Sequence, residues 1–206
     1  MKILRELQLK VNGNKRVLYF GMPDTEDELN QMYTLRYKVY AKYDYIDTAK
    51  FEKPIDIDKL DKDGSCIYFI TKLDDTVIGS VRLIQTENLP INTTCFKFDE
   101  PSDMAKLTWR ERGEIGRLVV RPYNKEERLP RNIILLFLID SLVTYSRENN
   151  IKAVYAFVTA VLKGKLQRLN IPINYIEDYE QIYPVDGTLY KYFHQEHNPI
   201  LPVYFV

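Results

Sequence analysis

The chain has 206 residues, which suits one domain spanning residues 1–206. Hydrophobic residues make up 45% and charged residues 28%, an ordinary balance for a globular protein with its own core. The 29 basic residues match the 29 acidic ones, so the formal net charge is zero, which argues against a general nucleic-acid binder. The longest apolar run, residues 133–139, is too short to span a membrane, and early charges argue against a signal peptide. We therefore expect a soluble, cytoplasmic protein.

The first third of the chain predicts a hairpin, a helix and a loop. Residues 7–20 are typical of a β-hairpin, or of a helical lead into one strand. Thr25 and Glu28 have the spacing of a capping box, so a helix should follow to about residue 43. Residues 44–64 carry many charges and little periodicity, which predicts a loop.

The rest of the chain alternates between strands and helices. The first half of the helix predicted at 130–149 is apolar on all sides, which indicates burial. This order of elements predicts an α/β (α+β) domain, a mixed sheet flanked by helices. The predicted strands are 65–73, 77–86, 114–120, 153–158, 173–177 and 201–206, the helices are 130–149 and 160–170, and residues 87–112 are irregular.

One arginine falls on the buried face of the first predicted helix. Leu29, Met32 and Tyr33 form the apolar stripe of that helix, and Arg36 lies on the same face, seven residues after Leu29. A buried arginine needs a partner, because an unpaired buried charge is very costly. The alternative is a side chain at the edge of the stripe whose charged end reaches water.

Three carboxylates, Asp56, Asp58 and Asp61, follow within six residues. Such a cluster repels itself unless it meets cations. The EF-hand pattern fails because Lys59 and Ile70 stand where calcium ligands are required, so we expect no metal site. Two interpretations remain: a solvated acidic loop, or carboxylates that receive arginines or a cationic substrate.

Two further arginines, Arg82 and Arg117, lie inside otherwise apolar predicted strands. Charges inside core strands are unusual and normally paired, so the arginines and aspartates suggest one buried polar network, either functional or purely structural. Glu114 and Arg117 are three residues apart, which puts them on opposite faces of a regular strand. A bulge at Gly116 would bring both to one side.

In order and spacing, these residues resemble the signature of the autoinducer (acyl-homoserine-lactone) synthases and of their cousins, the N-acyl amino acid synthases and the exosortase-associated acyltransferases. The second half looks more like the N-acyl amino acid synthase branch. The resemblance implies a GNAT fold, in which the fourth and fifth strands, here 114–120 and 153–158, splay apart to admit an acyl thioester. The matching pieces are residues 35–40, Asp56-x-Asp58-x-x-Asp61, residues 79–84 and Glu114-x-x-Arg117, then residues 166–171 and 183–187.

The resemblance also implies an activity: transfer of a fatty acyl group from an acyl-carrier-protein or coenzyme A thioester to a small amine, expected to be an amino acid. No tightly bound cofactor is expected. Glu114 is the expected catalytic base, and an acyl pocket is expected along Ala156, Phe157 and Val158. The implied polar cleft consists of Arg36, Asp56, Asp58, Asp61, Arg82 and Arg117.

Acyl carrier proteins are acidic, so a basic docking surface is expected close to the cleft; a solvated charged face is the alternative. Two basic clusters follow the cleft strands. The first is Arg121, Lys125, Arg128 and Arg131, and the second is Lys163, Lys165 and Arg168.

Three departures from the family patterns bear on the substrates. Lactone synthases usually carry a tryptophan after the first helix, where this chain has residues 43–46, and an aromatic residue where it has Gly113. These differences favour an amino acid over S-adenosylmethionine, with a lactone synthase or a non-catalytic acyl- or partner-binding module as alternatives. No glycine-rich phosphate loop follows the fourth strand, which favours a carrier protein as the donor.

Overall fold

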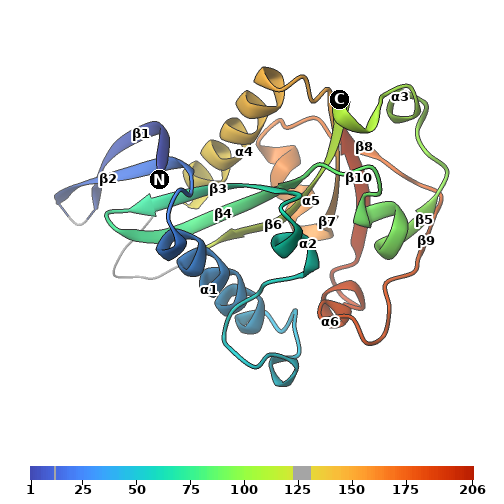
Figure 1. The fold of residues 1–206 in the computed structure, drawn as a ribbon, viewed down its shortest axis with the longest axis horizontal. Helices are drawn as coiled ribbons and strands as arrows, with labels where there is room; N and C mark the ends of the chain where they lie inside the picture. The colour runs from blue at the N-terminus through green and yellow to red at the C-terminus, as the bar shows by residue number, and fades with distance from the viewer. Residues whose placement is uncertain (12, 123–130) are drawn as a thin grey trace.

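The computed structural model describes residues 1–11, 13–122 and 131–206. Its main feature is an eight-stranded mixed sheet in the order β1-β2-β3-β4-β6-β7-β10-β8, beside which β5 and β9 form a separate pair (Figure 1). The strands are β1 (Lys2–Val11), β2 (Asn14–Met22), β3 (Cys66–Leu73), β4 (Thr76–Ile84), β5 (Phe96–Phe98), β6 (Arg112–Val120), β7 (Ala153–Thr159), β8 (Asn174–Tyr175), β9 (Tyr179–Gln181) and β10 (Ile200–Phe205).

Helices cover both faces of the large sheet, as the sequence predicts. In the view of Figure 1, α1 lies below β3 and β4, and α4 lies above them. Met32 and Leu35 of α1 belong to one buried cluster, and Ile134 and Leu138 of α4 belong to another on the opposite face. The helices are α1 (Glu26–Lys42), α2 (Lys59–Asp63), α3 (Ser102–Ala105), α4 (Arg131–Glu148), α5 (Ala160–Arg168) and α6 (Tyr190–Phe193), with short turns at Thr48–Lys50, Ile91–Cys95 and Trp109–Glu111.

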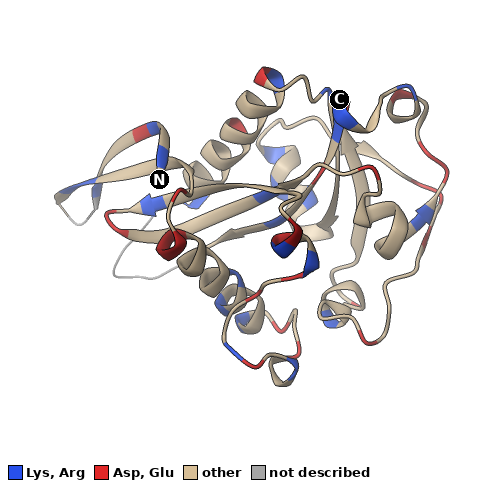
Figure 2. Cartoon of the chain, in the orientation of Figure 1, with Lys and Arg blue, Asp and Glu red and all other residues tan. Residues whose placement is uncertain are grey.

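The opening segment forms the hairpin β1–β2 rather than a helical lead. Helix α1 begins after Thr25, whose side chain accepts a hydrogen bond from the Glu28 amide at 3.2 Å. The reciprocal half of the predicted capping box is replaced, because the Glu28 carboxylate accepts from the amide of Asp24 and pairs with Lys72 at 2.9 Å. The acidic first turn of α1 (red in Figure 2) complements the helix dipole.

Two predicted irregular regions contain short elements. Residues 44–64 include a 3-10 turn and α2, and residues 87–112 include a π-helix at Ile91–Cys95, β5 and α3. Helix α2 forms because Asp58 and Asp61 cap each other, a pattern too short to produce a periodic apolar stripe. The strand predicted at 173–177 shortens to the two residues of β8.

The predicted splay lies between β6 and β7. These parallel strands pair from Arg112 with Ala153 to Ile115 with Ala156, and their pairing stops there. The strands therefore part beyond these pairs, toward Val120 at the end of β6 and Thr159 at the end of β7.

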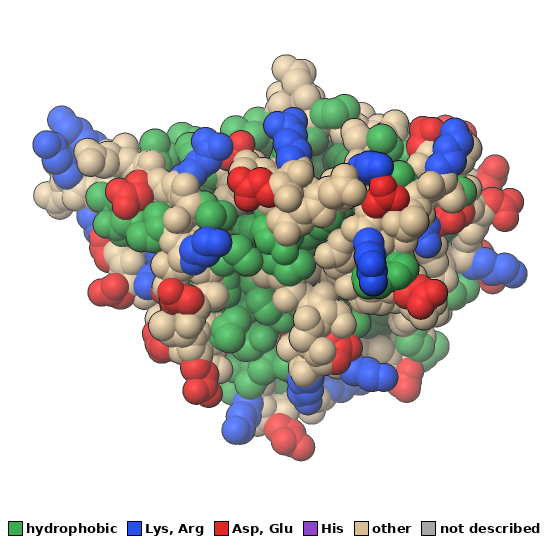
Figure 3. All heavy atoms as spheres, turned by 45° about the horizontal axis from the view of Figure 1, so that its top comes forward, with side chains coloured by type: hydrophobic (Ala, Val, Ile, Leu, Met, Phe, Trp, Pro, Cys, Tyr) green, Lys and Arg blue, Asp and Glu red, His purple; other side chains and the backbone are tan. Residues whose placement is uncertain are grey.

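Large hydrophobic side chains are not confined to the core. On the face shown in Figure 3, hydrophobic side chains gather in the middle, with Lys, Arg, Asp and Glu around them. On α4, Ile133, Leu136 and Val143 are exposed. Within the part of the chain that the structure describes, no helix combines the length and apolar content that a membrane span needs.

Candidate active site

Arg36 lies on the buried face of α1, where two carboxylates hold it. Its Nε donates to Oδ2 of Asp56 at 3.0 Å, and Nη1 and Nη2 donate to the two carboxylate oxygens of Asp61 at 3.2 and 2.8 Å. A bidentate pair of this kind fixes orientation as well as charge. Arg36 is fully buried, so its charged end does not reach water.

Arg82 and Arg117 meet the same aspartates from the neighbouring strands β4 and β6. Nη1 of Arg82 donates to both oxygens of Asp58 at 2.8 Å and to Asp61 at 2.9 Å. Nη2 of Arg117 donates to Asp58 at 3.2 Å, and its Nε lies 3.1 Å from Oδ2 of Asp56. The acidic segment is thus not a solvated loop, because its three carboxylates receive three guanidinium groups.

Asp61 is the centre of this network. It also accepts a hydrogen bond from the Tyr68 hydroxyl at 2.9 Å and from the amide of Asp58 at 2.9 Å. Burial opposes the ionisation of Asp61, but the positive charges of Arg36 and Arg82 outweigh it and hold its pKa well below the usual range. The carboxylate therefore stays ionised in the folded protein.

A β-bulge shapes β6 next to the network. Arg82 of β4 is opposite Gly116, whereas Ser80 is opposite Val119, so β6 carries one extra residue between these pairs. Arg117 takes up the extra residue with φ 55°, in the left-handed region. The predicted bulge is therefore present, but Arg117 rather than Gly116 adopts the unusual conformation.

Glu114 lies on β6 as a buried carboxylate without an ionic partner among the described residues. Its Oε2 accepts a hydrogen bond from the amide of Ile91 at 2.8 Å, where the π-helix begins. Burial raises the pKa of Glu114 to about 7, although the Ile91 hydrogen bond and the charge of Arg82 act in the opposite direction. A carboxylate with such a pKa can accept and release a proton near neutral pH.

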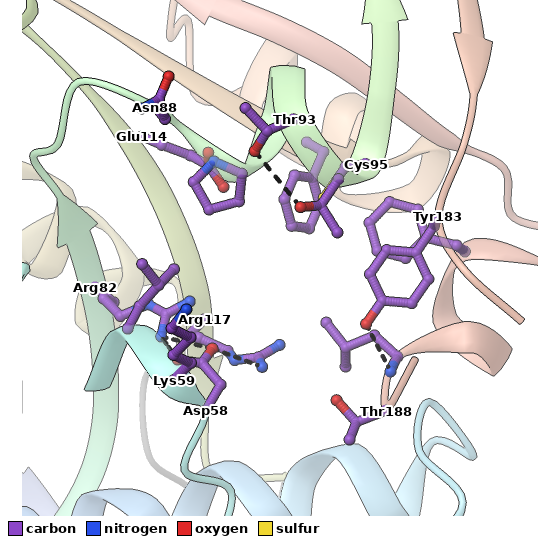
Figure 4. Close-up of a pocket in the computed structure, with 16 residues that line it drawn as sticks. Asp58, Lys59, Arg82, Asn88, Thr93, Cys95, Glu114, Arg117, Tyr183 and Thr188 are labelled. Carbon is purple, nitrogen blue, oxygen red and sulfur yellow. Dashed lines mark hydrogen bonds and ion pairs between the residues drawn. The ribbon is translucent and has the colours of Figure 1, made fainter. Parts of the chain in front are cut away.

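Glu114, Arg82 and Arg117 line one cavity of about 310 Å³ (Figure 4). This volume is in the range of small-molecule binding sites. Figure 4 shows Glu114 on one side near Asn88 and Thr93, and the arginines on another. Of the predicted cleft residues, Asp58, Arg82, Glu114 and Arg117 line the cavity, whereas Arg36, Asp56 and Asp61 do not and support them through ion pairs.

The third side of the cavity comes from the C-terminal part of the chain, which sequence reasoning left without a role. Tyr183 stacks on Phe193 with ring centroids 4.2 Å apart, and its hydroxyl accepts from the amide of Leu189 at 3.1 Å. A Cβ atom on Gly187 would lie 2.7 Å from Cζ of Tyr183, so this position has no room for a side chain. The sequence feature that pointed to this wall was the segment 183–187, which contains Tyr183 and Gly187 and forms part of the resemblance to the N-acyl amino acid synthases.

A scan of protein families matches residues 31–161 to the model described as N-acyl amino acid synthase FeeM. This chain belongs to that family. It is therefore an N-acyltransferase. No curated protein sequence matches the chain.

Solved structures show that this FeeM-family member shares the GNAT-like fold of the autoinducer synthases, which confirms the predicted fold class. The acyl-homoserine-lactone synthase LasI is 15% identical, with a TM-score of 0.65 over 92% of this chain and 88% of LasI. FeeM, an N-acyl amino acid synthase from uncultured soil microbes, is 13% identical, with a TM-score of 0.60 over 92% and 91%. MesI, a CoA-dependent acyl-homoserine lactone synthase, is 16% identical, with a TM-score of 0.59 over 85% and 79%.

The three predicted acyl-pocket residues of this FeeM-family member do not share one face of β7. Phe157 lines the cavity and packs on Phe193 at 5.1 Å. Ala156 and Val158 belong to a separate buried cluster that includes Leu166. The reason is the alternation of successive side chains across a strand.

The predicted docking residues are partly brought together. Burial lowers the pKa of Lys165 on α5, and the positive charges of Arg131 on α4 and Arg168 on α5 lower it further, so both arginines lie near Lys165. Lys163 instead lies over the ring of Tyr175, 4.4 Å from its centroid. Arg121 lies just after β6, with its amide bonded to the carbonyl of Ile78 at 2.7 Å. Lys125 and Arg128, which the sequence also predicts to contribute to docking, lie outside the described residues.

Neither cysteine is set up as a nucleophile. Cys95 lines the cavity, but burial raises the pKa of its thiol far above neutrality. Burial also raises the pKa of Cys66 to about 11. Both thiols therefore stay protonated, which favours direct transfer over a covalent enzyme intermediate.

Proposed function

We propose that this protein transfers a fatty acyl group from an acyl-carrier-protein thioester to the amino group of a small amino acid, with Glu114 as the general base. The observation that carries the proposal is the buried carboxylate of Glu114, whose pKa burial raises to about 7, in a cavity that Arg82 and Arg117 also line. Strands from both ends of the chain join one sheet, which supports a single domain.

The reaction needs the substrate ammonium group to lose two protons, one before and one after its nitrogen attacks the thioester carbonyl. Glu114 takes a proton from the substrate ammonium group, and the neutral nitrogen then attacks the thioester carbonyl carbon. The carbonyl oxygen becomes an oxyanion, for which backbone amides at the bulged and parted strand β6 are the proposed donors. The carbon–sulfur bond then breaks, and the nitrogen releases its second proton to water as the neutral amide forms. The leaving thiolate takes up the proton that Glu114 holds.

Arg36, Arg82 and Arg117 have a positioning role in this proposal. Their ion pairs fix the segment that contains the three aspartates, and Arg82 and Arg117 also offer donors to a substrate carboxylate within the cavity. The acyl chain is proposed to enter where β6 and β7 part, with Phe157 at the cavity end of its path.

For the donor, we propose a carrier protein that docks on the basic surface formed by Arg131, Lys165 and Arg168. Exposed Ile133 and Leu136, on the first turns of α4 beside Arg131, add apolar contact area. An acidic carrier protein matches such a surface in charge. Acyl carrier proteins and free amino acids meet in the cytoplasm, where we propose that the enzyme acts.

A lactone synthase is the second candidate, favoured by the likeness to LasI and MesI, two acyl-homoserine-lactone synthases. To separate the two, the protein is incubated with long-chain acyl-carrier-protein or acyl-coenzyme A, plus either single amino acids or S-adenosylmethionine, and products are read by mass spectrometry. The proposal expects N-acyl amino acids. Lactone from S-adenosylmethionine alone supports the second candidate, and thioester consumption with no amine at all contradicts both.

A further inference from the structure

Lys59, the first residue of α2, lines the cavity beside Asp58 (Figure 4). Its side chain is exposed, and among the residues that the structure describes it takes part in no ion pair or hydrogen bond. Its charge acts on the carboxylate of Asp63, one helical turn further along α2 and open to water. Lys59 is thus a cation at the cavity that no neighbouring carboxylate contacts directly.

The other cations at the cavity are already neutralised. Arg82 pairs with Asp58 and Asp61, and Arg117 pairs with Asp56 and Asp58. With Arg36, which pairs with two of the same carboxylates, three guanidinium groups balance three aspartates before any substrate binds. An additional anion in the cavity would therefore gain donors from the arginines but little net charge compensation.

An α-amino acid carries such an anion, its carboxylate, together with a cationic ammonium group. The ammonium group is matched by the carboxylate of Glu114, which burial keeps half-ionised near neutral pH. The substrate carboxylate is left to the other charged wall, where Lys59 supplies the compensating charge. A lysine suits this role because its flexible stem lets the ammonium group follow the ligand, and a partly enclosed site strengthens the pair.

We propose that Lys59 binds the carboxylate of the acceptor amino acid and so selects amino acids over amines that lack a carboxylate. This inference deepens the proposed function and rests on it, since it requires the acceptor to bind in this cavity. The sequence pattern did not predict this role, because Lys59 was notable there only as a residue that interrupts a calcium-binding motif.

The test compares matched acceptors in wild-type protein and in Lys59→Met. Leucine, phenylalanine and tyrosine are each paired with isopentylamine, phenethylamine or tyramine, the same molecules without the carboxylate, and KM is measured with a saturating acyl thioester. We expect Lys59→Met to raise KM for the amino acids about tenfold, the loss of one modest charge pair. KM for the amines should stay within about twofold, and Lys59→Arg should recover most of the difference.

Lys62→Met is the control, because Lys62 is an exposed lysine of the same helix that does not line the cavity. It should leave both classes of acceptor unchanged. Equal changes in KM for amino acids and amines in Lys59→Met, or no change in either, would overturn the assignment.

Binding measured without thioester separates this inference from the proposed function. Calorimetric titration of the same amino acids into wild-type protein and Lys59→Met reports carboxylate recognition even if no acyl transfer takes place. Weaker binding to the variant, in the absence of any wild-type turnover, upholds Lys59 and contradicts the proposed function. Turnover with unchanged selectivity contradicts the role of Lys59 alone. A wild-type protein that neither binds nor acylates any of the three amino acids contradicts both proposals.

Discussion

Glu114 and Arg117 both line the cavity, although they are three positions apart along β6 and a regular strand would turn one of them away. The bulge opposite Ser80 and Arg82 supplies the extra residue that restores them to one side. The proposed base, Glu114, and one of the cavity cations, Arg117, therefore both lie on the bulged segment of β6. That relationship makes β6 the element on which the proposed chemistry depends most directly.

Replacing Glu114 with Gln should remove the proposed base while keeping its hydrogen bond from Ile91, because the amide oxygen can still accept. We expect kcat to fall by roughly 100- to 10,000-fold, the usual range for a general base. Thioester consumption measured by thiol release reports the rate, and circular dichroism reports the fold. Wild-type activity in a folded Glu114→Gln variant would remove Glu114 from the mechanism.

The pH dependence of activity should follow the same group. Because burial raises the pKa of Glu114 to about 7, kcat/KM should rise as pH increases through 7, as the carboxylate loses its proton. The rate profile between pH 5 and 9 tests this, with non-enzymatic thioester hydrolysis subtracted. A profile that is flat between pH 6 and 8 would mean that Glu114 is already ionised or does not participate.

Stability should change with pH in the opposite sense. The folded-state pKa of Glu114 lies above its ordinary value of 4.5, so the folded protein holds a proton that the unfolded chain has released. The free energy of unfolding therefore falls as pH rises from about 4.5 to 7 and levels off above it. Glu114→Gln lacks this penalty, so its Tm should gain on the wild type between pH 5 and pH 8. A constant difference in Tm across that range would contradict the raised pKa.

Replacing Arg36 with Met should destabilise the protein strongly. Asp56 and Asp61 would lose a buried partner, and removing one side of a buried ion pair costs about 3–5 kcal/mol. Urea unfolding measures the difference. Arg16→Met, which breaks the exposed pair with Asp74, is the control and should move the midpoint little. Equal effects of the two changes would show that the network contributes no more than a surface pair.

Gly187→Ala should alter acceptor preference more than stability. The new methyl group would occupy the space of the Tyr183 ring, so this wall of the cavity must shift. We expect KM for bulky amino acids to change several-fold, measured over a panel of acceptors with a short thioester. Gly164→Ala in α5 is the control, because nothing lies within 4 Å of its Cβ and alanine favours a helix. Unchanged preference in Gly187→Ala would remove Tyr183 from the acceptor site.

Charge reversal at Arg131 and Lys165 should weaken docking of the carrier protein. We expect KM for acyl carrier protein to rise at least about tenfold, and less so at high salt, because screening already weakens the wild-type interaction. KM for a small acyl-N-acetylcysteamine thioester should not change. Lys10→Glu on β1, at the far edge of the sheet, controls for net charge. A parallel rise for both donors would indicate damage to the cavity rather than to a docking surface.

Local chemistry explains which features could be predicted from sequence. Buried charge is rare, so the presence of Arg36, Arg82 and Arg117 within apolar patterns predicted one shared polar network. The structure brings all three to the same group of aspartates. Glycine beside Arg117 indicated a bulge. The long helices and strands could also be predicted from the sequence, because their periodicity repeats over many residues.

Features that depend on tertiary contact could not be predicted in this way. The position of Tyr183 against Phe193 is fixed by packing between distant segments, and the segment itself has little periodicity. Lys59 has no local pattern that separates it from any other surface lysine. The face on which Ala156 and Val158 lie depends on strand register, which a resemblance to splayed strands does not specify.

The left-handed conformation of Arg117 links the position of Glu114 and Arg117 in the cavity to Asp56, which does not line the cavity. A non-glycine residue in this region costs about 1–2 kcal/mol, and the ion pairs to Asp56 and Asp58 hold it there. Without Asp56, one of the ion pairs that offset the strain at Arg117 is lost. β6 would then relax into regular pairing with β4, which would rotate Glu114 and Arg117 apart. The acidic segment that contains Asp56 and Asp58 would then fix which of two registers β6 adopts with β4, and we expect replacement of Asp56 to lower activity more than it lowers folding.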